Sequence, residues 1–171
     1  MIRFGLLGCG RIAKRHSELL GGSHIEGARL AAVCDPLNAR ADAIAARFGV
    51  PAFYDIGAFL AREDIDVVSV LTPSGLHAAH VIACAKAGKH VVVEKPMALR
   101  LQDAYDMIRA CDEAGVKLFV VKQNRFNVPV VKARQALEAG RFGRLFLGTV
   151  RVRWCRDQAY YDQDGWRGTW A

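Results

Sequence analysis

Short apolar runs alternate with segments of helical spacing along the first two thirds of the chain. Residues 67–71 are almost entirely apolar, as expected for a strand that is buried on both faces of a parallel sheet. Residues 39–48 instead place their apolar side chains at helical spacing. Strands that alternate with helices in this way are typical of βαβ units, so we expect an α/β fold with a Rossmann-type, doubly wound parallel sheet.

Glycines mark the expected ends of several helices in this first part. Gly49, Gly88 and Gly115 each follow a segment of helical spacing, where a left-handed residue commonly closes a helix. The expected strands are residues 2–7, 30–34, 52–54, 67–71, 90–93 and 118–121, and the expected helices are residues 12–20, 39–48, 56–62, 76–87 and 101–114.

The pattern changes after residue 124. Residues 128–139 have helical spacing, whereas residues 145–154 alternate apolar and polar positions, as an amphipathic strand of an antiparallel sheet does. One such strand is not stable alone, so its partners are expected in a missing segment or in another chain. We therefore predict a complete first domain over residues 1–124. Residues 125–171 would be the incomplete start of an α+β domain with an open, mainly antiparallel sheet.

Composition and cysteine spacing narrow the class of protein. Hydrophobic residues make up 52% and charged residues 24%, which is ordinary for a globular protein, and no apolar run approaches the roughly 20 residues of a membrane helix. The residues before Cys9 are too few for a secretory leader, so we expect a cytoplasmic protein. Five scattered cysteines without a C-x-x-C pair argue against a disulfide framework and a zinc site, and we expect no bound metal.

The net charge of +7 raises the question of nucleic-acid binding. No helix-turn-helix pattern, RNP motif or lysine tract accompanies it, so we expect neither a nucleic-acid nor a membrane partner. Clustered arginines suit an anionic small molecule, because a guanidinium binds carboxylate or phosphate through two hydrogen bonds. Alternatively, the balancing acids lie in sequence outside this chain. The late arginines are Arg141, Arg144, Arg151, Arg153, Arg156 and Arg167.

Gly8-Cys9-Gly10-Arg11-Ile12-Ala13 is a G-x-G-x-x-A motif that follows one expected strand and opens a helix. The first glycine suits a tight turn, the second lets backbone approach a pyrophosphate, and Ala13 permits close packing of helix on strand. Phosphates would then lie at the positive end of the helix dipole. The context of strand, turn and helix is the one that the dinucleotide-binding motif requires.

Asp35 ends the second expected strand, 22 residues after Ala13. An acid at this distance is expected to bind the adenosine ribose hydroxyls of a dinucleotide. Its negative charge disfavours a 2′-phosphate, so NAD is favoured over NADP, although Arg40 keeps NADP open. The alternative is that Asp35 merely begins an Asp-Pro turn.

Two further strand ends carry polar groups. Thr72-Pro73-Ser74 can offer hydroxyls and backbone amides to a cofactor, and Ser74 also suits the N-cap of the next helix. For His77, in the first turn of that helix, a cofactor contact and a packing role are both open. Glu94-Lys95-Pro96 follows residues 90–93, and Pro96 ends the strand because it has no N–H. A lysine there can meet cofactor and substrate together, although a surface lysine in a turn is the simpler alternative.

Taken in order, these motifs resemble the Gfo/Idh/MocA family of NAD(P)-dependent sugar oxidoreductases. Val120–Arg125, Tyr160–Asp162 and Trp166–Trp170 are more specifically similar to the UDP-N-acetyl-2-amino-2-deoxy-D-glucuronate 3-dehydrogenases of bacterial lipopolysaccharide synthesis. The resemblance implies a Rossmann NAD-binding domain followed by a substrate and oligomerisation domain. It also implies NAD-dependent oxidation of the C3 hydroxyl of a UDP-sugar, and a homo-oligomer in the full-length form.

Roles for individual residues follow from the same resemblance. Lys95 would be the catalytic lysine that contacts the substrate hydroxyl and the nicotinamide ribose, with Glu94 positioning it and Gln123 near the nicotinamide. The implied cofactor-binding set is Gly8, Gly10, Arg11, Ile12, Asp35, Thr72, Pro73, Ser74, His77, Glu94, Lys95 and Gln123. The implied substrate set is Arg125, Tyr161, Asp162, Trp166 and Arg167; for the aromatic residues among them, packing is the alternative role.

The sequence departs from the family pattern at its end. Family members are longer and carry a downstream Asp/His pair whose histidine is the expected general base, and none of the five histidines here matches that position. We therefore expect a truncated chain without activity of its own. Two alternatives stay open, which are another sugar or inositol dehydrogenase of the family and a non-catalytic NAD-binding module.

Overall fold

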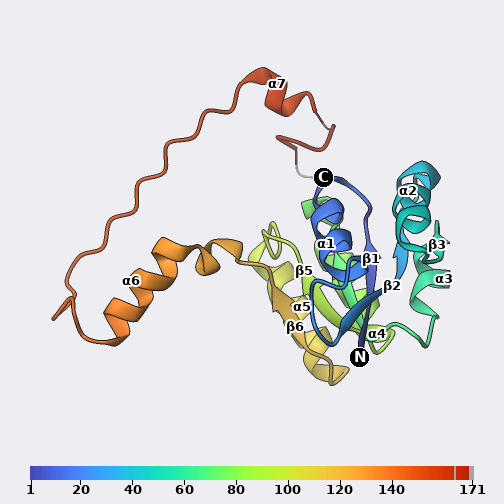
Figure 1. Ribbon diagram of the computed structural model, residues 1–171, viewed down its shortest axis with the longest axis horizontal. Coiled ribbons are helices and arrows are strands. Elements are labelled where there is room, and N and C mark those ends of the chain that lie inside the picture. Colours follow the sequence, from blue (N-terminus) through green and yellow to red (C-terminus); the bar gives the residue numbers. More distant parts are fainter. Residues whose placement is uncertain (164, 170–171) are drawn as a thin grey trace. The chain divides into compact units, whose positions relative to one another are not determined.

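A parallel sheet with helices on both faces makes up the first part of the computed structural model (Figure 1). The structure describes residues 1–163 and 165–169. The strands are β1 (Ile2–Leu7), β2 (Ala28–Cys34), β3 (Ala52–Phe53), β4 (Val67–Val70), β5 (His90–Val93) and β6 (Leu118–Val120). The helices are α1 (Arg11–Gly21), α2 (Asn38–Phe48), α3 (Ile56–Leu60), α4 (His77–Lys86) and α5 (Leu101–Glu113), with a 3-10 turn η1 (Ser74–Leu76) before α4.

The six strands lie in the order β3-β2-β1-β4-β5-β6, and every neighbouring pair is parallel. This confirms the α/β fold with a doubly wound parallel sheet. The strand order reverses between β1 and β4, and sheets of this kind bind ligands at such a point, just beyond the carboxyl ends of the strands. The glycines expected to close α2, α4 and α5 all have positive φ angles, as the sequence predicted.

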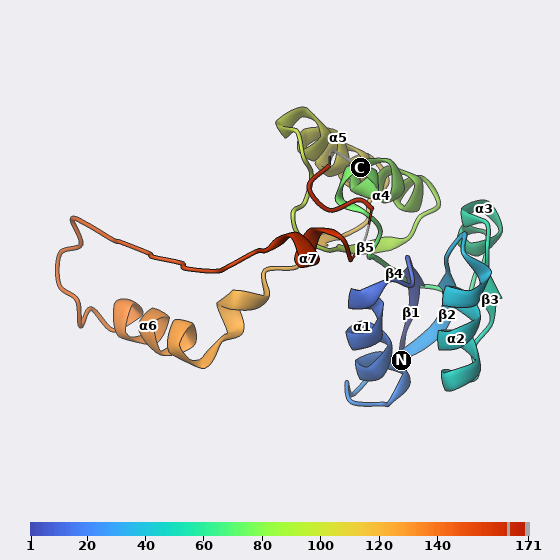
Figure 2. The ribbon, with the colours of Figure 1, turned by 90° about the horizontal axis from the view of Figure 1, so that it is seen from above.

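Helices cover both faces of the sheet (Figures 1 and 2). On one face, α1 and α2 contribute Leu20 and Ala41 to a core with residues of β1 and β2. On the other face, α3, α4 and α5 contribute Phe59, Val81 and Met107 to a second, larger core. The central strands are therefore buried on both sides, which explains why β4 is almost entirely apolar.

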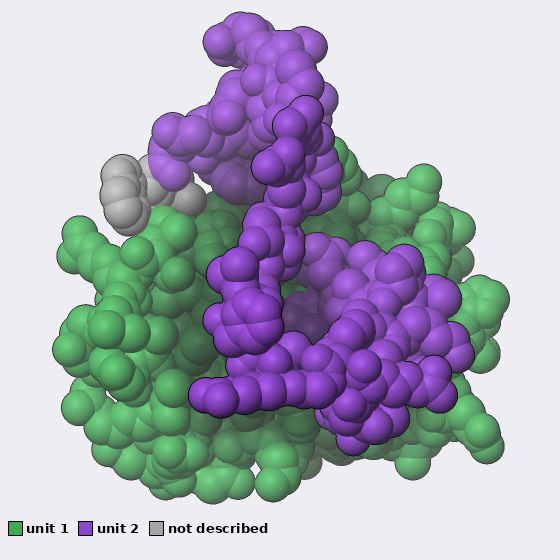
Figure 3. Space-filling model, turned by 90° about the vertical axis from the view of Figure 1, so that its left-hand side faces the viewer, with its two compact units in different colours: residues 1–121, 170–171 green, residues 122–169 purple. Residues whose placement is uncertain are grey.

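Residues 122–169 form a second unit (Figure 3). It contains a 3-10 turn η2 (Gln123–Phe126) and the helices α6 (Val128–Glu138) and α7 (Gln158–Tyr161). The strand expected over residues 145–154 was a wrong prediction, because no described residue of this unit lies in a strand. Phe146 and Val150 are 92% and 90% exposed. Their alternation suits a sheet, but a strand needs a partner for its ladder hydrogen bonds, and the described residues supply none.

Across 1–163 and 165–169, no helix is long and apolar enough to cross a membrane. Within the same ranges, no group of three or more His, Cys, Asp or Glu side chains lies together as a metal ion would need.

Candidate functional site

The carboxyl ends of β2, β1, β4 and β5 lie side by side at one edge of the sheet. Backbone hydrogen bonds continue just past the strands, since the Gly8 amide donates to the Cys34 carbonyl at 2.8 Å and the Glu94 amide to the Val70 carbonyl at 3.0 Å. These bonds fix the direction in which the following loops leave the sheet. The predicted site residues on these loops, or on the first helical turn beyond them, are Gly8, Gly10, Arg11, Ile12, Asp35, Thr72, Pro73, Ser74, His77, Glu94 and Lys95.

The turn between β1 and α1 requires a glycine at its first position. Gly8 has φ +96°, and a Cβ built on it would lie 2.9 Å from the Leu71 carbonyl carbon and 3.0 Å from the Thr72 nitrogen. Both are backbone atoms, which cannot easily move. Any larger residue at Gly8 would therefore strain the turn and push β1 away from the end of β4.

The N-terminus of α1 is open to an anion. No side chain caps it, and no acidic residue lies in its first turn. A Cβ built on Gly10 would meet nothing within 4 Å, so this glycine leaves free space rather than relieving a clash. Free amides and the positive end of a helix dipole favour phosphate binding. The residues at this turn therefore fit a pyrophosphate group.

Asp35 is 6% exposed and holds two loops together through its carboxylate. One oxygen accepts from the Cys9 amide at 2.8 Å, and the other from the Leu37 amide at 2.9 Å. Each carboxylate oxygen can accept a further hydrogen bond, so the group can still bind hydroxyls. Burial and then the charge of Asp35 raise the pKa of the neighbouring Cys9 thiol to about 12. That thiol is therefore neutral, and the carboxylate is the charged group of this loop pair.

A hollow of about 360 Å³ between α1 and α2 reaches the same glycine turn. Cys9 and Gly10 lie at one end of it, and Lys14 and Arg40 contribute cationic groups. Arg40 thus lies near the turn, where it could bind the 2′-phosphate of NADP, so NADP stays open as the alternative cofactor.

Thr72, Pro73 and Ser74 connect β4 to α4. The Thr72 hydroxyl lies 2.9 Å from Nδ1 of His80, so it is already engaged within the protein. The expectation that Ser74 caps α4 was wrong. Ser74 instead begins η1, and no side chain caps that turn or α4. The reason is that Pro73 fixes an extended entry, after which the chain tightens into a 3-10 turn before the α-helix begins.

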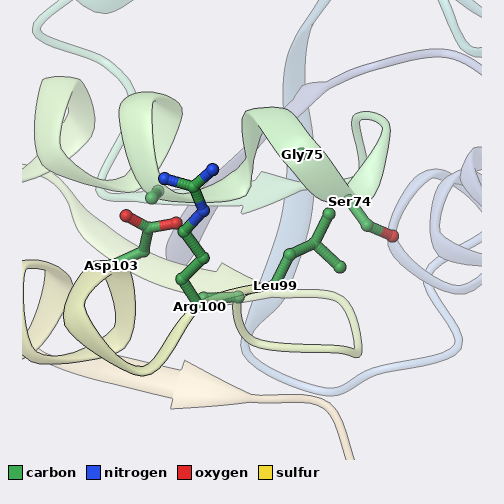
Figure 4. Close-up of a pocket in the computed structure, with 7 residues that line it drawn as sticks. Ser74, Gly75, Leu99, Arg100 and Asp103 are labelled. Carbon is green, nitrogen blue, oxygen red and sulfur yellow. The ribbon is translucent and has the colours of Figure 1, made fainter. Parts of the chain in front are cut away.

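A pocket of about 190 Å³ opens beside this turn (Figure 4). Ser74 and Gly75 border it from η1, and Arg100 and Asp103 border it from the start of α5. Its volume is below the range of about 300–1,000 Å³ typical of small-molecule sites. Lys95 does not line it. We therefore assign the pocket no ligand.

Glu94 connects the end of β5 to α1. One carboxylate oxygen lies 3.3 Å from Nε2 of His16, and the other accepts from the Lys95 amide at 3.1 Å. Burial by itself would raise the pKa of Glu94, but the hydrogen bonds from His16 and the Lys95 amide outweigh it, and the pKa is lowered. Glu94 is therefore a carboxylate that shapes the backbone on which Lys95 is carried.

We expect Glu94→Gln to change how stability depends on pH. Because the pKa of Glu94 is lowered in the folded state, its stabilising contribution is present above the unfolded-state value, about 4.3. It is lost as the pH falls through the folded-state value. The free energy of unfolding, measured in urea, should thus differ most between wild type and variant at pH 6–7, and the two curves should converge only as the pH falls through the lowered pKa of folded Glu94. Glu26→Gln, at an exposed position, is the control; parallel curves for wild type and Glu94→Gln would contradict the assignment.

Lys95 itself is exposed. Its side chain makes no hydrogen bond or ion pair within residues 1–163 and 165–169, although its amide is held by Glu94. An ammonium that is anchored through the backbone and free at its tip can bind a group placed beyond the strand ends. This is the arrangement that catalysis by Lys95 would need, and its role stays a prediction.

The remaining predicted residues belong to the second unit. Gln123 and Arg125 lie in η2 and are exposed. Tyr161 ends α7, and the Asp162 carboxylate accepts a hydrogen bond from the side-chain Nε2 of Gln158 at 2.8 Å. The roles of this group with cofactor or substrate remain predictions. Trp170, part of the resemblance at the end of the chain, lies outside the described residues.

Arginine and aromatic side chains of the second unit stack on one another. The guanidinium carbons of Arg156 and Arg167 each lie 4.4 Å from the centroid of the Tyr160 ring, and that of Arg167 lies 5.4 Å from the Trp166 ring. Trp166 is 40% exposed and Arg167 is 8% exposed. The contact with Arg167 supports the packing role that was left open for the aromatic Trp166.

The sequence did not single out His16, whose ring contacts Glu94 across 78 positions of chain. No local pattern reveals such a pair, because His16 looks like any polar residue on an amphipathic helix. The contact of Asp35 with the Cys9 amide was likewise hidden, although the G-x-G spacing placed both residues near one cofactor.

Known proteins share this fold and these motifs. Residues 2–122 match the GFO_IDH_MocA family, described as an oxidoreductase family with an NAD-binding Rossmann fold. The WlbA dehydrogenase of Bordetella pertussis, in a crystal structure in complex with NADH and UDP-GlcNAcA, is 48% identical with a TM-score of 0.93. That match covers 99% of this chain and 51% of the WlbA chain.

More distant relatives act on other compounds. Inositol 2-dehydrogenase of Rhizobium meliloti is 36% identical over 89% of this chain and 45% of its own length. D-apiose dehydrogenase of Paraburkholderia graminis is also 36% identical, over 86% of this chain and 39% of its own length. The chain therefore spans about half the length, or less, of the proteins that it matches.

Proposed function

The chain belongs to the Gfo/Idh/MocA family of oxidoreductases, and we propose that it is the NAD-binding part of a dehydrogenase that oxidises the C3 hydroxyl of a UDP-N-acetyl-amino-glucuronate. The observation that carries the substrate is the 48% identity with a dehydrogenase crystallised with NADH and UDP-GlcNAcA. Identity to the inositol and apiose dehydrogenases is 36%.

The loops at the strand ends fit NAD. The open N-terminus of α1 and the space at Gly10 suit the pyrophosphate, and Asp35 retains acceptor capacity for ribose hydroxyls. NAD, when bound, supplies the acceptor for the hydride that leaves C3. Everything else at this edge serves to hold the cofactor and to place Lys95 beside it.

Lys95 is proposed to act on the substrate oxygen. Its ammonium would donate a hydrogen bond to the C3 hydroxyl oxygen and stabilise the negative charge that develops there as hydride leaves. The hydroxyl proton would pass to a general base, which in the family that the motifs resemble is the histidine of an Asp/His pair. Glu94 would keep the Lys95 backbone in place through the bond to its amide, which is 3.1 Å long.

The second unit is proposed to begin the substrate and oligomerisation domain. Residues 125–171 would contribute Arg125, Tyr161, Asp162, Trp166 and Arg167 to substrate binding. Gln123, which lies just before this range, would contact the nicotinamide. A homo-oligomer and a cytoplasmic location remain predictions of the same proposal.

A direct assay tests this function in a full-length enzyme that contains the chain. With NAD and UDP-GlcNAcA, NADH should form in step with a 3-keto sugar nucleotide, followed by absorbance and by mass spectrometry. Absence of both, in protein that is folded and binds NAD, would overturn the proposed substrate.

An inositol or simple sugar substrate is the second candidate. The inositol 2-dehydrogenase match over 89% of the chain favours it. The same assay with myo-inositol separates the two candidates, because NADH should then form without any nucleotide sugar. If the protein binds NAD but turns over neither compound, the result would support a non-catalytic NAD-binding module.

Asp35→Asn should narrow the preference for NAD over NADP. The substitution keeps the size of the side chain but removes the charge that repels a 2′-phosphate, while Arg40 stays near the turn. We expect the Kd for NADP divided by the Kd for NAD to fall about tenfold, equal to about 1.4 kcal/mol. Asp42→Asn, which alters an acid bound to the Tyr54 hydroxyl, is the control. An unchanged ratio for Asp35→Asn in calorimetric titrations would contradict the role of Asp35.

A further inference from the structure

The His77 ring lies between two backbone carbonyl groups from different loops. Its Nδ1 lies 2.8 Å from the carbonyl oxygen of Pro96, and its Nε2 lies 2.9 Å from that of Thr72. The ring is buried, with the residue 1% exposed. His77 thus connects the loop after β4 with the turn that carries Lys95.

The two acceptors limit the form that the ring can take. A carbonyl oxygen can only accept a hydrogen bond, and a neutral imidazole has one N–H donor and one bare nitrogen. A neutral ring would leave a lone pair facing one of the carbonyls at 2.8–2.9 Å. Only the imidazolium form donates to both oxygens at once.

Charged groups lie on the elements around the His77 ring, and from the start of α5, Arg100 and Asp103 border the same pocket as Ser74 and Ala78. His80 lies next to the same helix end, and its Nδ1 is 2.9 Å from the Thr72 hydroxyl; burial, with a smaller contribution from His77, lowers the pKa of His80. On the facing turn, the ionisable groups are Glu94 and Lys95. The positive end of α4 works against a charge on His77, and the two carbonyl oxygens offset it.

We propose that His77 is a positioning residue for Lys95, whose imidazolium ring donates to the carbonyls of Thr72 and Pro96 and so fixes the two loops to each other. The proposal rests on the proposed function only where it concerns Lys95 as the catalytic group. Through this clamp, the loop after β4, which would contact the cofactor, and the turn that carries Lys95 keep one relative geometry.

Nitrogen NMR of the 171-residue chain, labelled with 15N in histidine and examined at pH 7.5, tests the ring directly. The ring-nitrogen signals of His77 are assigned in the wild type through their couplings to the other atoms of the same side chain. They should show a proton on both ring nitrogens. Exposed His24 is the internal reference. One protonated and one bare nitrogen in His77 would overturn the proposal, whether or not the chain binds NAD.

A variant tests the positioning role in the full-length enzyme. His77→Gln carries its two N–H donors on a single nitrogen, which cannot reach both carbonyls, so kcat should fall roughly 10–100-fold, while Kd for NAD stays close to the wild-type value. The melting temperature should fall modestly, because one buried carbonyl loses its hydrogen-bond partner. His24→Gln should change none of these. An unchanged kcat, or a lowered melting temperature with unchanged kcat, would limit His77 to structure and overturn the proposal. Failure of the wild type to bind NAD would instead count against the proposed function.

Discussion

Replacing Lys95 by Ala in a full-length enzyme that contains this chain should lower kcat by about 10²–10⁴. The expected loss is large because an ammonium beside the C3 oxygen stabilises charge that exists only in the transition state. Kd for NAD should rise far less than kcat falls, because Lys95 would make only one of the several contacts to the cofactor. The melting temperature should stay unchanged, because the Lys95 side chain is exposed and holds no other part of the fold.

Steady-state kinetics and NAD titration of the same preparation check this result. Lys86→Ala, at an exposed lysine in the last turn of α4, controls for loss of one positive charge. If Lys95→Ala retained wild-type kcat, or lost turnover only in proportion to NAD affinity, Lys95 would be a surface lysine in a turn.

The two glycines of the first turn should separate stability from cofactor binding. Gly8→Ala combines a strained φ of +96° with backbone contacts of 2.9–3.0 Å. We expect it to reduce the free energy of unfolding by roughly 2–5 kcal/mol and the melting temperature by roughly 5–15 °C. Gly10→Ala should leave the melting temperature unchanged, because its Cβ meets nothing and its φ of −76° suits any residue.

The new methyl group of Gly10→Ala should instead hinder the pyrophosphate. We expect NAD to bind at least about tenfold more weakly, a cost of about 1.4 kcal/mol. Each variant is thus the control of the other in thermal unfolding and calorimetry. Equal NAD affinity for Gly10→Ala and wild type would place the pyrophosphate elsewhere.

The sequence predicted the sheet domain well because strong local patterns and burial agree there. β1 and β5 have the predicted bounds, since each is a short apolar run that ends at a glycine or at Glu94-Lys95-Pro96. The strand over residues 145–154 failed for the opposite reason. Its alternation is a local pattern whose outcome depends on a partner strand, and the described residues contain none.

The candidate site was predictable only in part. The G-x-G turn and Asp35 could be placed together, because parallel strands end at one edge of a sheet. The pairing of His16 with Glu94 could not, because it joins positions far apart with no shared pattern. The 3-10 turn at Ser74 was also missed, since a serine after Pro73 suits an N-cap equally well from sequence alone.

The central claim is that four strand ends form one NAD site on this chain. Titration of the 15N-labelled chain with NAD, followed through backbone amide signals, tests it residue by residue. We expect signals of Gly8, Gly10, Asp35, Thr72 and Lys95 to shift together along one saturating curve. No shift at saturating NAD, or shifts confined to residues 122–169, would contradict the claim.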